Sequence, residues 1–469
     1  MTATLSPNTA PTTAGARTRV AEPGLVRGLG LWSSIAIVVG TMIGTGIFLK
    51  PGEVAREAGS FEWAMLAWAI GGLLSLAGAL GYAELGAAMP EAGADYVYLT
   101  RGFGPAWGFL YGWKNAVVTG PATLAALSSG IALFSSFFLP GLRDTVLQAG
   151  SFGITGGQLL AAAIILLVGA VNLLPVRTVG RTQVVLTGLK VASLLLVVAA
   201  GLLIGPAVGA PLQAAIPAAA AVTVPGLLAA AVASLWAYSG WHTLVRVGSE
   251  VADPGRTLPR AMIGGFMATA GLFMLLNLAC FSILGFSGVA ASSQPVADML
   301  QWVLGSGVAG WLTVVMILCA LGSLNASMLA SGRVAYAMGR DGFLPGMGTI
   351  HEVRRVPSNA VGATASIGVL LVLTGSFEDL TSLFVFTQWT FLALGTVALF
   401  RLRRLEPDLP RPVRTWGYPV VPGLFIAVSL LLTASIFVAR PVRSSIGVAL
   451  VLSGLVVYHR RRAATRVRP

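Results

Sequence analysis

Long apolar segments alternate with short polar ones along almost the whole chain. In chain order the apolar segments are Leu31–Leu49, Trp63–Ala88, Phe103–Phe138, Gln158–Leu174, Val184–Ile204, Pro225–Val245, Met262–Phe286, Val308–Met338, Asn359–Thr374, Leu380–Phe400, Pro422–Val438 and Ser444–Val457. A helix needs about 20 apolar residues to cross a bilayer, and most of these segments supply them. The pattern therefore predicts twelve spans, the third long enough to be tilted and the last the shortest.

The composition supports this prediction. Of the 469 residues, 56% are apolar and only 10% are charged, and the mean hydropathy is +0.83. Soluble domains carry about 25% charged residues, so this chain needs lipid as part of its solvent. We expect an all-α polytopic membrane protein. Cys280 and Cys319 lie in apolar segments without paired spacing, which predicts neither a disulfide framework nor a thiolate metal site. We expect no metal and no cofactor.

The charges indicate how the chain is oriented. Lysine and arginine number 30. With the amino terminus inside, 23 arginines, Arg246 among them, fall in cytoplasmic segments and five basic residues fall on the other side. Lys114 and Lys190, which lie within spans, make up the rest. Because cytoplasmic loops are enriched in Lys and Arg, we expect both termini in the cytoplasm and a multi-pass protein of the plasma (cell inner) membrane.

The two ends of the chain have a different composition from the spans. Residues 1–30 are rich in Thr, Ala and Pro and lack an apolar run, and residues 459–469 are rich in arginine. We expect a disordered cytoplasmic tail at the amino end and a basic cytoplasmic tail at the carboxyl end.

The first span contains three glycines within seven residues, Gly40, Gly44 and Gly46. Glycine in a helix interior costs about 1 kcal/mol relative to alanine. Gly40 and Gly44 form a GxxxG pattern that would suit close helix packing, but Gly46 lies on another side of the helix. We therefore favour an unwound segment whose free backbone groups bind a ligand.

The sixth span has a comparable interruption, with Ser239, Gly240 and His242 in an otherwise apolar segment. Aromatic packing around a kink is the alternative interpretation. Spans one and six occupy corresponding positions in two halves of five helices. A pair of glycine-interrupted helices at such positions is typical of a transporter binding site.

Two broken helices imply a polar cavity, because unpaired backbone groups in hydrocarbon cost several kcal/mol each. The half-helix after a break presents free N–H groups and a positive dipole end, which suit a carboxylate. The half-helix before a break ends in free carbonyls, which suit an ammonium group. Both together fit a zwitterion.

These motifs carry a resemblance to a known family. The first span matches the pattern G-x-x-I-G-[ST]-G-I-F followed by P-G, from Gly40 to Gly52. Further matches are Tyr82-Ala-Glu84-Leu-Gly86, Pro90-Glu-Ala-Gly93, Asp95-Tyr96, Asn172, Leu235 to Trp241 with Glu250, Pro254, Arg256 and Pro259, Gly322-Ser-Leu-Asn325 with Arg333, Arg340-Asp-Gly342 with Pro345, and Arg411-Pro412 through Tyr418-Pro419. In this order the chain resembles, along nearly its whole length, the amino acid-polyamine-organocation superfamily, closest to its L-type amino acid transporter branch. Ala94 departs from the pattern, since it replaces the second glycine of a usual Gly-Gly pair.

The resemblance implies a leucine-transporter-like fold. It consists of two inverted five-helix repeats, residues 31–204 and 225–401, and two additional helices within residues 419–458. The resemblance also implies a substrate site at the two breaks, with N–H groups on the carboxylate and carbonyls on the ammonium. Trp236 resembles the aromatic residue that closes over the substrate. The residues of the expected site are Met42, Ile43, Gly44, Thr45, Gly46, Trp236, Ala237, Ser239 and His242.

Lys190 lies deep in the fifth span, where an ionised side chain costs about 2.5–3.5 kcal/mol or more. It therefore needs a partner, unless it snorkels to a helix end. Its position resembles that of a lysine which takes the place of a sodium ion in sodium-independent members of the family. A permanent cation would replace sodium, and a titrating one could carry a proton; both interpretations stay open.

Other polar residues in the spans have competing interpretations. Lys114 is expected to be an interfacial residue near the start of the third span, and Glu84 a structural gate contact. His242 either bonds to a neighbouring helix or lines the side-chain pocket. Ser239 beside it is uncharged, which favours neutral substrates, because a cationic side chain would require a carboxylate.

We predict a sodium-independent secondary transporter of amino acids, with neutral L-amino acids as substrates and either exchange or proton symport as the mechanism. A polyamine or cationic amino acid carrier of the same superfamily is the alternative. A membrane enzyme is disfavoured, because no HExxH or GxSxG motif occurs. A channel is disfavoured because no filter loop or charged ring is evident. No partner subunit and no nucleic acid are indicated.

Overall fold

The computed structural model describes residues 24–44, 46–149, 152–204, 223–305, 307–374, 377–439 and 441–466. Residues 1–23 of the predicted amino-terminal tail therefore lie outside the described residues, and so does Thr45 of the expected site. In the described part the chain is almost entirely helical. One short antiparallel hairpin, β1 (Thr145–Ala149) and β2 (Phe152–Thr155), is the exception that the apolar pattern did not predict.

Each of the twelve apolar segments overlaps one or more helices. The α-helices are α1 (Leu31–Met42), α2 (Gly46–Ala58), α3 (Phe61–Ala88), α4 (Asp95–Phe103), α5 (Pro105–Trp113), α6 (Gly120–Ser135), α7 (Gly156–Asn172), α8 (Val176–Ala199), α10 (Val224–Ala237), α11 (Pro254–Ala291), α12 (Pro295–Leu304), α13 (Val308–Arg340), α14 (Ser358–Leu373), α15 (Phe377–Leu405), α16 (Val420–Ala439) and α17 (Pro441–Arg466). Short π-helical segments, η1 (Lys114–Thr119) and η3 (Ala200–Ile204), join α5 to α6 and extend α8.

Several helices are long and apolar enough to cross a bilayer by themselves. Among the described residues these are α3, the continuous α5–α6, α8, α11, α13 and α16, and α1 with α2 forms a further span if the bent pair is counted as one. The third predicted span begins at Pro105, because Gly104 with φ of 104° separates α4 from α5. A polytopic helical membrane fold follows.

Both predicted interruptions are present. The axes of α1 and α2 meet at 48° across residues 43–45. Helix α10 ends at Ala237, and Gly240 with φ of 117° turns the chain into a 3₁₀ segment, η4 (Trp241–Arg246). The expectation of an α-helical half after this second break is wrong, because Thr243 N–H bonds to the Gly240 carbonyl in an i→i+3 pattern. Of the two breaks, only the first is therefore followed by the amino-terminal end of an α-helix, that of α2.

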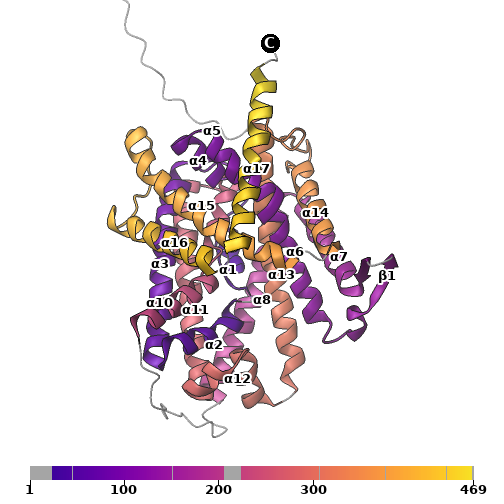
Figure 1. The fold of residues 1–469 in the computed structure, drawn as a ribbon, viewed down its shortest axis with the longest axis vertical. Helices are drawn as coiled ribbons and strands as arrows, with labels where there is room; N and C mark the ends of the chain where they lie inside the picture. The colour runs from indigo at the N-terminus through magenta and orange to yellow at the C-terminus, as the bar shows by residue number, and fades with distance from the viewer. Residues whose placement is uncertain are drawn as a thin grey trace, which may run out of the picture.

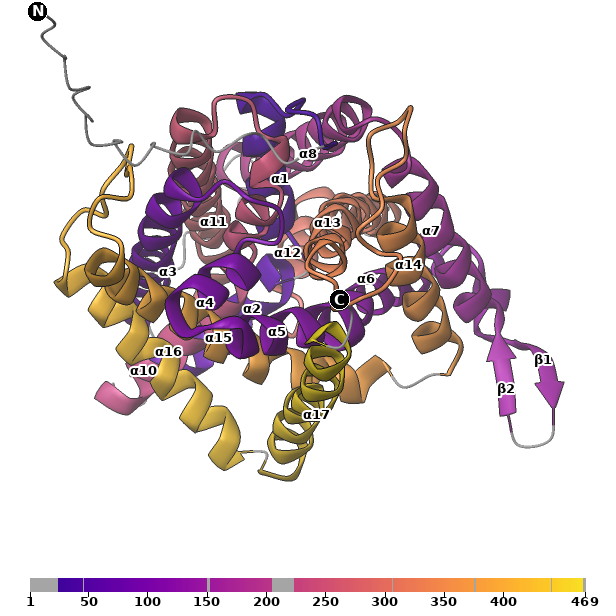
Figure 2. The ribbon, with the colours of Figure 1, turned by 90° about the horizontal axis from the view of Figure 1, so that it is seen from above.

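The first broken helix lies in the middle of the protein. Helix α1 packs against α8, α11 and α13, and α2 packs against α3, α10, α11 and α12. Helices α16 and α17 lie at the periphery, where they contact α3, α5 and α15 (Figure 2). Helix α4 lies at one end of the molecule and α12 at the other (Figure 1). Because protein surrounds the break, irregular backbone is tolerated at this depth.

Glu250, in the turn η5 (Gly248–Glu250), joins three parts of the chain. Its carbonyl accepts the N–H groups of Gly28 and Leu29, both at 2.9 Å. Arg333 of α13 donates to its carboxylate at 2.7 and 2.9 Å, and both side chains are fully buried. Packing of the amino-terminal segment therefore begins before residue 31, since Leu29 is also fully buried.

We expect Glu250→Gln to lower the free energy of unfolding by about 3–5 kcal/mol, because it leaves the Arg333 guanidinium buried without a counter-charge. Thermal unfolding of purified protein in detergent measures this. The same substitution at Glu53, whose pair with Lys50 is partly exposed, should lower it by less than about 1 kcal/mol. Equal destabilisation by the two variants would contradict the assignment.

Candidate functional site

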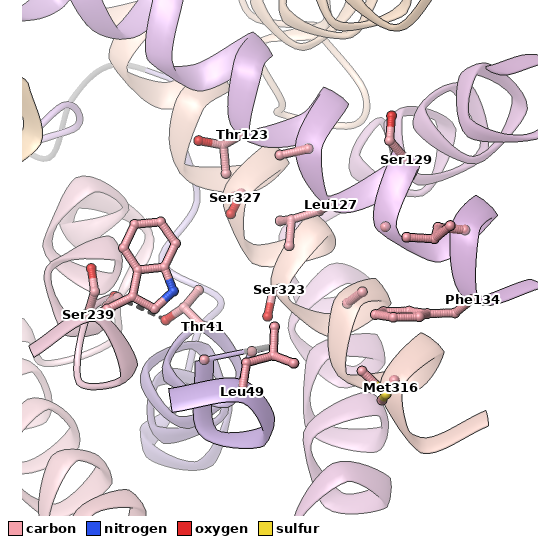
Figure 3. Close-up of a pocket in the computed structure, with 18 of the residues that line it drawn as sticks. Thr41, Leu49, Thr123, Leu127, Ser129, Phe134, Ser239, Met316, Ser323 and Ser327 are labelled. Carbon is pink, nitrogen blue, oxygen red and sulfur yellow. Dashed lines mark hydrogen bonds between the residues drawn. The ribbon is translucent and has the colours of Figure 1, made fainter. Parts of the chain in front are cut away.

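A cavity of about 1120 Å³ lies against the two breaks. Thr41 and Ser239, from the broken helices, lie on one side of it. Thr123 and Leu127 of α6 and Ser323 and Ser327 of α13 line the side across from them (Figure 3). Segments far apart in the sequence therefore form one pocket, as a ligand between two interrupted helices requires.

The cavity opens toward the end of the molecule where α12 lies. Its lining there includes Phe137 and Arg143, which precede the hairpin, and Gln294 and Gln301 of the α12 region. Phe137 is more than half exposed. The predicted orientation makes this end the non-cytoplasmic one.

Polar contacts fill the opposite end, beside α4. Glu84 accepts from Arg403 at 2.6 and 2.9 Å and from the Thr415 hydroxyl at 2.7 Å, as expected for a structural gate contact. The Asp95 carboxylate accepts from the Tyr82 and Tyr111 hydroxyls at 2.5 and 2.8 Å. The pocket is therefore open at one end and closed at the other.

The two breaks touch each other. The Thr41 hydroxyl donates to the Gly240 carbonyl at 3.0 Å. A Cβ atom at Gly46 would lie 3.0 Å from the Trp236 ring and 3.1 Å from Cα of Ala237. Gly46 is thus required for this close approach. Because α2 begins at Gly46, the N–H groups of its first turn have no partner within the helix.

The carbonyl groups expected to bind the ammonium lie across from the first turn of α2. Met42, Trp236, Ala237 and Ser239 all line the cavity. The Trp236 carbonyl accepts the Ser239 N–H at 3.3 Å, and Ala237 is the last residue of α10, whose carbonyl has no partner within that helix. The Trp236 side chain is 38% exposed. Of the described residues in the expected site, the structure therefore brings Met42, Gly44, Gly46, Trp236, Ala237, Ser239 and His242 to one cavity.

Ile43 is placed differently. Its side chain is fully buried and it is not among the described residues that line the cavity. Its carbonyl accepts a hydrogen bond from Lys190 at 3.1 Å, and so faces the interior of the helix bundle.

Lys190 is fully buried, so the snorkelling alternative is wrong. Its ammonium donates to the carbonyls of Gly40 at 2.6 Å and Ile43 at 3.1 Å, and to the Ser323 hydroxyl at 3.2 Å. The Ser323 hydroxyl in turn donates to the Gly40 carbonyl at 2.9 Å. Oxygen atoms from the end of α1 and from Ser323 of α13 therefore surround the ammonium group.

The expectation for Lys114 is wrong. Its side chain is fully buried at the start of η1, and Nζ donates to Oε1 of Gln388 at 3.0 Å. Nε2 of Gln388 lies 3.2 Å from Nε2 of His242, which lines the cavity. His242 therefore contacts a neighbouring helix and also lines the cavity, while its role toward a substrate stays a prediction.

Arg246, expected in a cytoplasmic segment between spans, is instead buried within the protein. It is only 7% exposed, lines the cavity, and lies 3.6 Å from the Asp95 carboxylate. The sequence did not single out Gln388 or Asn115, although each is a polar residue inside an apolar segment, which was the available signal. In the described part, no group of His, Cys, Asp and Glu side chains could hold a metal ion.

Comparison with known proteins decides the family. The model of the amino acid permease family matches residues 29–458. The chain belongs to this family. It is an amino acid transporter of the amino acid-polyamine-organocation superfamily, not an enzyme, and its apolar helices span a membrane.

Relatives match over most of their length. The serine/threonine exchanger SteT of Bacillus subtilis is 29% identical over 93% of this chain and 97% of its own. The human large neutral amino acids transporter small subunit 2 is 31% identical over 92% of this chain and 80% of its own. The mouse b(0,+)-type amino acid transporter 1 is 28% identical over 94% and 89%.

We expect Gly46→Leu to weaken amino acid binding to this permease by about tenfold or more, or about 1.4 kcal/mol, because the new side chain must displace Trp236 or Ala237. Binding of labelled amino acids to purified protein measures this. Gly271→Leu is the matched control, because no heavy atom lies within 4 Å of a Cβ there. Unchanged affinity in Gly46→Leu would argue against the assigned pocket.

Proposed function

We propose that this permease is a sodium-independent secondary transporter of neutral L-amino acids that works by alternating access. The observation that carries the proposal is the contact between the two breaks, which sets the first turn of α2 beside the carbonyl end of α10 at one cavity. A zwitterion has its two charges close together, and these two helix ends have opposite partial charges. The α-carboxylate would lie at the N–H groups of Gly44, Thr45 and Gly46, and the ammonium at the carbonyls of Met42, Trp236, Ala237 and Ser239.

Lys190 supports sodium independence. Carbonyl and hydroxyl oxygens are the ligands that hard cations prefer, and here the ammonium group uses those of Gly40, Ile43 and Ser323. A tethered cation in that position would stabilise the end of α1 without a bound ion. A side chain that exchanges its proton during the cycle would couple transport to protons, and a permanently charged one fits exchange.

The difference between the two ends of the pocket supports alternating access. We propose twelve spans, arranged as two inverted repeats of five followed by α16 and α17, with both termini in the cytoplasm. In that orientation the structure is open to the outside and closed to the cytoplasm. The contacts of Glu84 and Asp95 would break when the protein opens inward.

The lining of the cavity supports neutral substrates. Among its described residues there are two arginines and one histidine, and no aspartate or glutamate. A cationic side chain or a polyamine would be buried without a counter-charge, which is unfavourable. The names of the relatives include serine, threonine and large neutral amino acids among the substrates of those proteins.

Purified protein in liposomes tests the proposal. We expect uptake of labelled neutral amino acids that is unchanged when choline replaces sodium outside. Uptake that needs internal amino acid would indicate exchange, and uptake driven by a pH gradient alone would indicate proton symport. Uptake that stops without sodium would refute sodium independence.

We expect Lys190→Ala to abolish this uptake, because the carbonyls of Gly40 and Ile43 lose their cationic partner while the packing of α8 is largely kept. Size-exclusion chromatography of the variant should show a folded, monodisperse protein. Uptake at the wild-type rate would remove Lys190 from the mechanism.

A further inference from the structure

The closed end of the pocket collects polar side chains that the proposed function does not use. They are Asn115 of η1, His242 and Arg246 of η4, and Gln388 of α15, and all four line the cavity. Each is at least nine-tenths buried. We refer to these four residues as the polar end of the pocket.

Three of these residues have hydrogen-bonding atoms without a partner. Nδ1 of His242, Oδ1 of Asn115, and Nε and Nη2 of Arg246 are buried and make no hydrogen bond within the described structure. The Arg246 guanidinium lies 3.6 Å from the Asp95 carboxylate, longer than a hydrogen bond, and 5.8 Å from the centroid of the Tyr111 ring. Buried polar atoms in native proteins almost always find partners, and because these three residues also line the cavity, a ligand there would supply them.

Lys114 and Gln388 determine which hydrogen-bonding role His242 has. The Lys114 amine donates to Gln388 at 3.0 Å, which assigns the oxygen of the Gln388 amide to the Lys114 side. The amide nitrogen then faces Nε2 of His242 at 3.2 Å and can only donate. Nε2 is therefore the acceptor, and the ring proton lies on Nδ1. His242 thus offers Nδ1–H to the cavity as a hydrogen-bond donor.

The polar end thus offers donors from His242 and Arg246 and an acceptor from Asn115. A carboxylate accepts hydrogen bonds but donates none, so with the Asn115 amide oriented as in the structure it would leave Oδ1 unpaired. An ammonium group donates but does not accept, and it would face the Arg246 guanidinium. A hydroxyl or an amide both donates and accepts, so it satisfies both kinds of group.

We propose that the polar end recognises the side chain of the substrate, and that this permease selects neutral amino acids with a hydroxyl or amide side chain over apolar ones of the same shape. The proposal rests on the proposed function. Asn115, His242 and Arg246 contact the side chain, and Lys114 and Gln388 are positioning residues that keep the proton on Nδ1 of His242.

Isosteric pairs test this selection. In liposomes with wild-type protein we measure how strongly unlabelled amino acids inhibit uptake of a labelled substrate. We expect inhibition by threonine at a concentration about tenfold or more lower than by valine, or inhibition by glutamine at a concentration about tenfold or more lower than by methionine. Ratios near one for both pairs would overturn the proposal. Stronger competition by glutamate than by glutamine would overturn the assignment of a neutral side chain. If no amino acid is taken up at all, the proposed function fails instead.

Variants locate the selection. We expect Asn115→Leu to reduce the favoured ratio to about two or less, with valine uptake in the same vesicles as the internal reference. Asn277→Leu is the matched control: Asn277 is fully buried in α11 and is not among the described lining residues. This variant should keep the wild-type ratio. A wild-type ratio in Asn115→Leu would contradict the role of Asn115.

The positioning role has a readout that packing alone would not change. Nitrogen NMR of protein with labelled histidine, of which the chain has three, reports which ring nitrogen carries the proton. We expect His242 protonated on Nδ1 in the wild type. In Gln388→Glu the carboxylate accepts from both neighbours, so the proton should move to Nε2 and the side-chain ratio should fall. A proton on Nε2 in the wild type would refute the positioning role.

Discussion

The structure depends on how the backbone is satisfied where α1 stops inside the membrane. Carbonyls that would bond to the next helical turn are left free there, and lipid offers them no partner. Lys190 and Ser323 supply donors to Gly40, and Lys190 also to Ile43. Because the partners come from α8 and α13, the break is stable only when these helices pack around it. The N–H groups in the first turn of α2 remain without a partner in the helix and are then available to a ligand.

Buried charges in this permease are satisfied in three different ways. Lys190 uses backbone and hydroxyl oxygens, Lys114 uses a side-chain amide, and Arg333 uses a carboxylate. These choices fit their positions. The fully paired Glu250–Arg333 bridge lies at the closed end, where it joins separate segments, whereas Asn115, His242 and Arg246, which have unmet hydrogen bonds, face the cavity. The residues that stabilise the fold by charge pairing therefore lie apart from the polar groups that are available to a substrate.

Much of the fold could be predicted from local sequence. A span is a run of apolar residues and needs no knowledge of its neighbours, so each of the twelve segments overlaps one or more helices. Glycines at Gly44, Gly46 and Gly240 identified both breaks for the same local reason. The 3₁₀ form of the chain after Gly240 and the hairpin before α7 were missed, because hydrogen bonds across a turn and between short strands leave no apolar periodicity.

The sequence by itself therefore determined that the chain crosses a membrane, where two helices are interrupted, and that Lys190 needs a partner, since each follows from the cost of polar groups in hydrocarbon. Only the tertiary structure decided what those groups meet. It buried Lys114 and Arg246, which sequence position had placed at an interface and in a loop, and it turned the Ile43 carbonyl toward Lys190. The physical reason is that a side chain's partner lies on another helix, often more than a hundred residues away, and local composition contains no information about which helix packs there.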